Sequence, residues 1–192
     1  ATELSVVEVG AQAHSTNIGT GLTVLRGRNI SKTAAAFSFY PTKNLGGYGD
    51  GGEVITNDPE IADQVRRWRN GGMADNYRSD QPGRNSRLDE LQAAILRVKL
   101  PHLKSWTKRR RSIAARYTME LKTVQTPEGS ADHVYHLYPV RTTSRNSLRA
   151  HLQQRGIGSA IHYPWPLHQQ GAFIGRSKTI GPLDITQRCC DT

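Results

Sequence analysis

Two short apolar runs near the start of the chain have the length and composition of buried strands. Leu4–Val9 and Ala34–Phe39 are each followed by glycine, proline or polar residues of the kind that end a strand. The second run stops just before Pro41, and proline has no N–H to donate to a sheet ladder. We therefore expect a sheet whose second strand leads directly into a turn.

A segment with helical periodicity follows these strands, and the sequence predicts both ends of its first helix. Asp58 is placed to cap the helix, and Pro59 occupies its first turn. Gly71-Gly72 ends it, because glycine readily adopts the backbone conformation that closes a helix. The apolar positions of this helix are Ile61, Val65 and Trp68.

Two further helices are predicted on either side of Pro101, which breaks or kinks the helical run. We expect Asn85 to head the first of them. Its apolar face is formed by Leu88, Leu91, Ala94, Ile95 and Val98. The second covers Leu103–Leu121. Its apolar stripe is formed by Trp106, Ile113, Ala114 and Tyr117.

The last third of the chain has a strand–helix–strand pattern. Val134–Arg141 alternates as a half-buried strand, Ser147–Arg155 is a short amphipathic helix, and Ile157–Tyr163 is a second strand. Residues 181–192 are expected to be frayed. The pattern is typical of an α/β protein, and 192 residues are enough for one domain or for two small lobes.

The candidate chemistry centres on Lys43, which follows the second predicted strand. The glycine-rich stretch of residues 46–52 comes next, where the backbone can turn sharply or approach a ligand closely. A lysine fixed at such a place is suited to amine chemistry as a nucleophile. A lone lysine in a loop would ordinarily be a solvated surface residue, so the interpretation depends on the sequence around it.

That surrounding sequence resembles the DegT family of fold-type-I, pyridoxal-phosphate-dependent aminotransferases, which act on nucleotide-linked keto-sugars. Four ordered motifs carry the resemblance, and together they are far more specific than one short pattern. They are Phe37–Asn57, Asn85–Leu96, Val134–Tyr138 and Gly156–His168. The resemblance implies a strand at Glu53–Asn57. It also implies an α/β fold of two domains. Residues 1–100 would be part of the cofactor-binding large domain, and residues 101–192 would form a linking helix and a small α+β domain.

The resemblance assigns roles to individual residues. Lys43 would form the Schiff base with pyridoxal phosphate and then act as general acid and base. Family positions that contact the cofactor correspond to Gln12, Ser38 and Asn85, the last reaching the neighbouring subunit's cofactor. Tyr163 and His168 lie in the segment that faces the substrate. No metal site is expected. The implied substrates are a nucleotide-linked keto-sugar and an amino-acid donor.

Two departures from the family pattern leave a second interpretation open. Val9 stands where the family has an aspartate that faces the pyridine nitrogen, and the lysine segment begins too early for a full-length member. We therefore expect the chain to lack an N-terminal half and to form a homodimer or pair with a companion chain. Alternatively, the chain is a catalytically impaired or split-subunit member that serves as a binding or partner protein.

Composition favours anionic partners, because the formal net charge is +10. The run Lys108–Arg111 taken alone suggests nucleic-acid binding, but no nucleic-acid-binding motif accompanies it, and we expect the solvated face of a helix instead. Cys189 and Cys190 form no disulfide framework. No signal peptide or membrane-spanning run is evident, so we expect a cytoplasmic protein without membrane partners.

Overall fold

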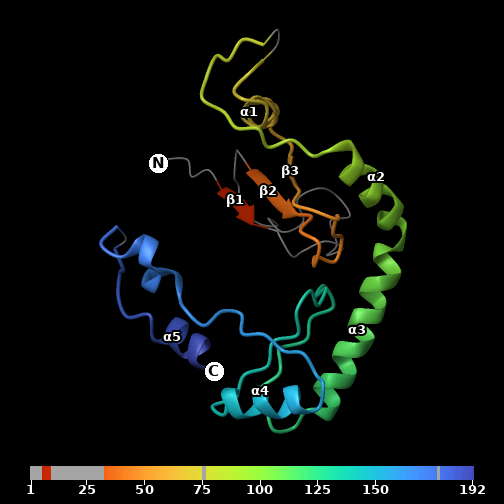
Figure 1. Ribbon diagram of the computed structural model, residues 1–192, viewed down its shortest axis with the longest axis vertical. Coiled ribbons are helices and arrows are strands. Elements are labelled where there is room, and N and C mark those ends of the chain that lie inside the picture. The colour runs from red at the N-terminus through yellow and green to blue at the C-terminus, as the bar shows by residue number, and fades with distance from the viewer. Residues whose placement is uncertain (1–5, 10–32, 75–76, 177) are drawn as a thin grey trace. The chain divides into compact units, whose positions relative to one another are not determined.

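The computed structural model describes residues 6–9, 33–74, 77–176 and 178–192 of the chain (Figure 1). Two compact units divide it. Unit 1 comprises residues 1–114 with residues 129–136, and unit 2 comprises residues 115–128 with residues 137–192. Unit 1 contains the sheet and the Lys43 segment.

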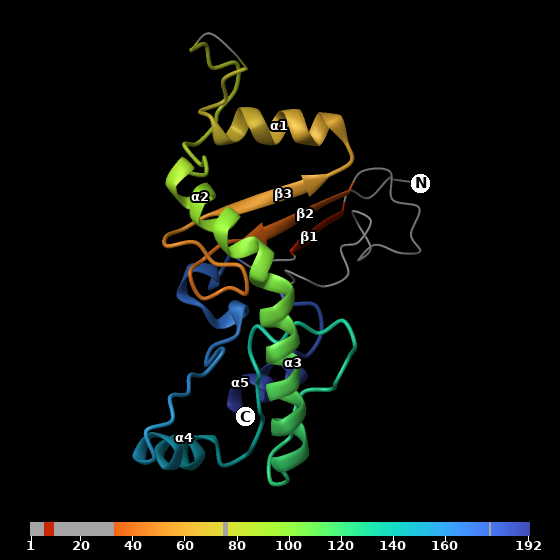
Figure 2. The same cartoon turned by 90° about the vertical axis from the view of Figure 1, so that its right-hand side faces the viewer.

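The sheet of unit 1 has the strand order β1-β2-β3. Its strands are β1 (Val6–Val9), β2 (Thr33–Ser38) and β3 (Gly52–Thr56). β2 is central, pairing in parallel with β1 and antiparallel with β3 (Figure 2). These strands confirm the expected ones where the structure describes them. Among the described strands, β3 has a neighbour on one side only, so one of its edges is open.

Helix α1 (Pro59–Arg69) follows β3 and packs against it (Figure 2). Its start is the predicted one, because the Asp58 carboxylate accepts hydrogen bonds from the backbone N–H groups of Glu60 and Ile61. Basic residues in the last turn complement the negative end of the helix dipole. Local capping chemistry therefore decides where this helix begins.

Helix α2 (Glu90–Lys99) begins later than expected, so the prediction that Asn85 heads it is wrong. Asn85 instead forms an antiparallel bridge with Asn70, and the Ser86 N–H donates to the Arg69 carbonyl at 2.8 Å. These contacts hold the segment extended until Asp89, which takes the N-cap position.

The expected apolar face of α2 is also largely wrong. Leu91 is 78% exposed and Val98 is 72% exposed. The side facing the rest of unit 1 carries Gln92, Leu96 and Lys99, which are spaced as i, i+4 and i+7. Two of these three residues are polar, so a hydrophobic pattern could not identify this face.

Pro101 lies in the 3-10 turn η2 (Leu100–His102), which joins α2 to α3 (Leu103–Glu120). The predicted break is thus a local tightening of one helical run, in agreement with the preference of proline for the first turn of a helix. Of the predicted stripe on α3, Ala114 is buried, whereas Trp106, Ile113 and Tyr117 are exposed. The other buried positions of the helix are Leu103 and Thr107.

A small hydrophobic core ties the Lys43 loop to these helices. Its buried members are Phe39, Leu45, Leu96 and Leu103, and Leu88 packs against them. Phe39 and Leu45 flank Lys43 in sequence, and the other two core leucines come from α2 and α3. The loop is therefore anchored in the core on both sides of the lysine.

Unit 2 contains helices and no strand among its described residues. The helices are α4 (Arg145–Gln154), the 3-10 turns η3 (Leu167–Gln169) and η4 (Gly171–Phe173), and α5 (Asp184–Asp191). α4 confirms the predicted amphipathic helix. Residues 181–192 were expected to be frayed, and α5 corrects that expectation.

The two strands predicted around α4 are wrong. A strand needs a partner for its backbone N–H and C=O groups. Only the single bridge Gln125↔Arg141 involves this part of the described chain. Tyr135 also has φ of 46°, a left-handed conformation that interrupts an extended run. The alternating pattern of residues 134–141 therefore reflects partial burial without sheet pairing.

No described helix combines the length and the apolar character that a membrane crossing would require.

Candidate functional site

Lys43 lies at the end of a tight turn that follows β2. Its N–H donates to the Tyr40 carbonyl at 2.8 Å, which makes Tyr40–Lys43 a hydrogen-bonded turn with Pro41 at its second position. The Ser38 hydroxyl accepts a hydrogen bond from the Tyr40 N–H at 3.2 Å. Tyr40 thus links the two residues that the sequence assigned to the cofactor, and it does so through its backbone.

Glycine at position 46 is required for the loop to close. The Gly47 N–H donates to the Phe39 carbonyl at 2.8 Å, which brings the end of the turn back to the end of β2. A Cβ atom on Gly46 would lie 2.4 Å from the Pro41 carbonyl oxygen, far inside van der Waals contact. Any side chain at this position would force the Lys43 turn open.

Two polar residues of α2 hold the far side of this loop. The Gln92 side-chain oxygen accepts from the Tyr48 N–H at 2.7 Å, and Lys99 Nζ donates to the Gly46 carbonyl at 2.6 Å. Lys99 Nζ also lies 4.8 Å from the centroid of the Tyr48 ring, within cation–π range. These contacts could not be predicted from the sequence, because a glutamine and a lysine on a helix carry no signal of a distant partner.

Asn44, which directly follows Lys43, is 5% exposed. Its side-chain Nδ2 donates to the Val134 carbonyl at 2.9 Å, across a sequence separation of 90 residues. The Oδ1 atom of the same amide has no hydrogen-bond partner among the described residues. Asn44 belongs to the Lys-Asn-Leu segment, but no hydrophobic or capping pattern marks it as a buried donor.

The other predicted site residues are distributed over both units. Gln12 lies outside the described residues. Asn85 is exposed in unit 1, where its Oδ1 accepts from Arg87 Nε at 3.2 Å. Tyr163 is exposed and His168 is half-buried in η3, and both belong to unit 2. The structure therefore brings together Lys43 and Ser38, which share one turn.

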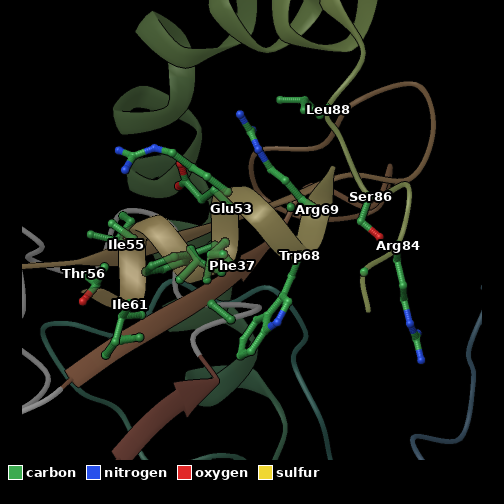
Figure 3. A pocket seen from close by; sticks show the side chains of 18 of the residues that line it. Phe37, Glu53, Ile55, Thr56, Ile61, Trp68, Arg69, Arg84, Ser86 and Leu88 are labelled. Atoms are coloured by element: carbon green, nitrogen blue, oxygen red, sulfur yellow. The ribbon is translucent and has the colours of Figure 1, made fainter. Parts of the chain in front are cut away.

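A hollow of about 1280 Å³ lies elsewhere in unit 1, among β2, β3, α1 and the segment 82–88 (Figure 3). Its apolar lining includes Phe37, Ile61 and Trp68, and none of the predicted site residues lines it. Arginine side chains of α1 and of the segment 82–88 also line it. The predicted apolar face of α1 is thus turned toward an open space beside the free edge of β3.

Glu53 lines this hollow, and partial desolvation there raises the pKa of its carboxyl above the ordinary glutamate value, although the residue keeps contact with solvent. A carboxyl with a raised pKa binds more protons in the folded protein than in the unfolded chain, so it lowers stability as pH rises through that pKa.

We expect Glu53→Gln to be more stable than the parent at neutral pH and equally stable in acid below the unfolded pKa. Urea unfolding at a series of pH values checks this, with exposed Glu60→Gln as the control. Parallel profiles for both variants and the parent would contradict it.

No group of three or more histidine, cysteine, aspartate or glutamate side chains among the described residues could hold a metal ion.

Comparison with known proteins places these features in a family. The family model for DegT/DnrJ/EryC1/StrS aminotransferases matches residues 1–192. The chain belongs to this family. A DegT-family relative, the dTDP-3-amino-3,4,6-trideoxy-alpha-D-glucose transaminase of Streptomyces venezuelae, is 46% identical over 189 residues. That match covers 94% of this chain and 48% of the relative.

Solved structures of other family members confirm the fold. The crystal structure of S. venezuelae DesV in complex with a ketimine intermediate matches with a TM-score of 0.82 at 43% identity, covering 97% of this chain and 50% of that one. NtdA from Bacillus subtilis, with bound cofactor PMP, matches with a TM-score of 0.78 at 27% identity, covering 97% and 44%. The chain thus has part of the fold-type-I transferase fold and spans about half the length of these relatives.

Members of this family depend on pyridoxal phosphate, and the described residues around Lys43 fit that cofactor. A primary amine for its carbonyl group and a hydroxyl for its phosphate stand at one strand end, joined through Tyr40. The loop that carries them is closed by Gly46 and held by Gln92 and Lys99. Lys43 and Ser38 therefore carry chemical groups that suit this cofactor, and the Tyr40 backbone links them.

Proposed function

We propose that this chain is the lysine-bearing part of a pyridoxal-phosphate-dependent aminotransferase that acts on a nucleotide-linked keto-sugar. One observation carries the proposal: in a chain of the DegT family, Lys43 stands at the end of β2 in a loop closed by backbone hydrogen bonds and by contacts from α2. A surface lysine in an ordinary loop would not need a loop held by this many hydrogen bonds.

The residues divide the work of the reaction. Lys43 supplies the amine that attaches the cofactor, and afterwards carries a proton as general acid and base. The Ser38 hydroxyl would bind the phosphate, together with Asn85 of a neighbouring subunit, and Gln12 would lie against the ring. Tyr163 and His168 would face the sugar. When bound, pyridoxal phosphate supplies an electron sink for the carbon that loses its proton.

The substrate class follows from the charge of the chain and the family it belongs to. The net charge of +10 favours a doubly charged nucleotide diphosphate group, which a sugar nucleotide carries. The S. venezuelae relative is named for a dTDP-linked amino sugar. An amino acid would provide the nitrogen. We also propose a cytoplasmic location, in keeping with the free thiols of Cys189 and Cys190.

The partner follows from the open side of unit 1. The chain spans about half of its relatives, and β3 leaves one strand edge and an apolar hollow uncovered. We propose that polypeptide equivalent to the unmatched half of the relatives covers this side, and that the completed fold is a homodimer. Such polypeptide could be part of the same protein or a companion chain.

The function is tested by amino transfer to a dTDP-linked 3-keto-sugar from a panel of amino acids, in the presence of the completing polypeptide. Because valine neither accepts a hydrogen bond nor carries charge, we expect Val9→Asp to raise the rate of the first half-reaction. The gain is at most about tenfold for each pK unit gained by the ring nitrogen, because only the stabilisation felt in the transition state speeds the reaction. Glu8→Gln serves as the control. Protein that carries cofactor on Lys43 yet transfers no amino group, even as the Val9→Asp variant, would favour the partner-protein interpretation.

A further inference from the structure

The segment 133–136 belongs to unit 1 although it follows α3 in sequence, and α3 holds it there. Arg111 Nε donates to the His133 carbonyl at 2.9 Å. Arg110 donates from one terminal nitrogen to the carbonyls of Tyr135, at 3.1 Å, and His136, at 3.4 Å. Two of the four residues in the basic run of α3 therefore donate side-chain hydrogen bonds to backbone carbonyls. Within this run, the predicted solvated face is confined to Lys108 and Arg109, which are exposed.

The same segment receives the side chain next to Lys43. The Val134 carbonyl, between those held by Arg111 and Arg110, accepts the hydrogen bond from Asn44 Nδ2 at 2.9 Å. Val134 is 5% exposed, as is Asn44, so this bond lies inside unit 1. In such a place a hydrogen bond is stronger than in water, and a broken one leaves a buried carbonyl without a partner.

An asparagine at position 44 destabilises the folded state unless its side-chain N–H group is needed as a hydrogen-bond donor. The Oδ1 atom is buried without a hydrogen-bond partner among the described residues, and burial of an unpaired amide oxygen destabilises the folded state. An apolar side chain of similar size would avoid that cost. The donor to Val134 is thus the contact that accounts for an asparagine here.

From these contacts we propose that Asn44 is a positioning residue for Lys43. Its amide ties the Lys43 turn to the segment 133–136, and Arg110 and Arg111 tie that segment to α3. Gln92 and Lys99 of α2 hold the same loop by their own hydrogen bonds. The loop is therefore supported by α2 and by α3, which are joined through η2. The inference rests on the proposed function only in taking Lys43 as the lysine that is held.

The first test uses amide hydrogen exchange of the full chain without added cofactor. Loss of the Asn44 bond should free the turn, so Asn44→Ala should speed exchange at Lys43 and Gly47, whose N–H groups close it, by about tenfold. Exchange in α1 should not change. Thr42→Ala, on the exposed side of Lys43, is the matched control. Unchanged exchange at Lys43 and Gly47 in folded Asn44→Ala protein would overturn the inference.

The second test measures covalent attachment of pyridoxal phosphate to Lys43, trapped with borohydride and located by peptide mapping. In Asn44→Ala the rate constant at saturating cofactor should fall about tenfold, while the half-saturating concentration stays the same. A merely structural defect would lower the thermal midpoint without this split. If the parent chain, supplied with the completing polypeptide, attaches no cofactor to Lys43, the proposed function fails, and the exchange experiment still decides the role of Asn44.

A variant outside the Lys43 loop tests the same inference if the Asn44→Ala protein does not fold. Arg110→Met releases two carbonyls of the segment 133–136 and should cause a smaller change of the same kind at Lys43 and Gly47. Arg109→Met, which removes an exposed cation from the same helix, should cause none. Equal exchange in the two arginine variants would show that the segment does not support the loop.

Discussion

Replacing Lys43 by arginine will abolish covalent attachment of pyridoxal phosphate to this chain. Arginine keeps the positive charge and much of the length of lysine, so the loop closed by Gly46 should persist. The guanidinium is never deprotonated in proteins and offers no amine nucleophile. Any turnover in the completed enzyme should fall by about 10²–10⁴-fold, the usual contribution of a general acid–base group.

Borohydride reduction followed by peptide mapping provides the measurement, with exposed Lys108→Arg as the control. The control should attach cofactor like the parent, because its amine lies on α3 away from the Lys43 turn. Reduced cofactor found on another lysine, or found equally in Lys43→Arg protein, would refute the assignment. The same experiment with Ser38→Ala should leave the attachment site unchanged and weaken cofactor affinity, since the hydroxyl would bind phosphate.

The second large effect concerns the open side of unit 1. We expect the chain to form a complex with the segment of the S. venezuelae transaminase that it does not span. The hollow is lined with apolar side chains, β3 offers a free edge, and Trp68 beside them is 53% exposed. When the free partner is present at a concentration about a hundredfold above its Kd, the free energy of unfolding should rise by about 2.7 kcal/mol.

Tryptophan emission can report this contact directly. In a Trp106→Phe, Trp165→Phe variant the remaining emission comes from Trp68, which should shift to shorter wavelength when the partner excludes water. Without the partner we expect self-association. A monodisperse monomer that unfolds cooperatively, binds no completing segment and keeps its Trp68 emission would contradict the proposal. A Trp68→Arg variant should weaken the complex without affecting the Lys43 turn.

The sequence predicted those parts of the fold that local chemistry decides. Asp58 and Pro59 specify the start of α1, and Pro41 specifies the turn after β2, because each acts on residues within a few positions of itself. The family resemblance added Lys43, which no local pattern could distinguish from a surface lysine. Ser38 was placed beside it by the same motif.

The wrong predictions for Asn85 and for the apolar face of α2 share a physical cause, which is contact with residues far away in sequence. Asn85 would cap a helix in isolation, but its bridge to Asn70 keeps it extended. Leu91 and Val98 have helical spacing, yet polar Gln92 and Lys99 form the inward side of α2 because their partners are backbone groups of the Lys43 loop. Such pairings cannot be inferred from hydrophobic periodicity, which records burial and not hydrogen bonding.

The attachment of residues 129–136 to unit 1 means that the chain passes between its two units three times. No single peptide bond therefore separates them. Exchange of unit 2 between family members requires two inserted stretches, residues 115–128 and residues 137–192, with the parent's own 129–136 left between them. A single crossover between residues 114 and 115 would pair the Lys43 loop of one protein with the supporting segment of another.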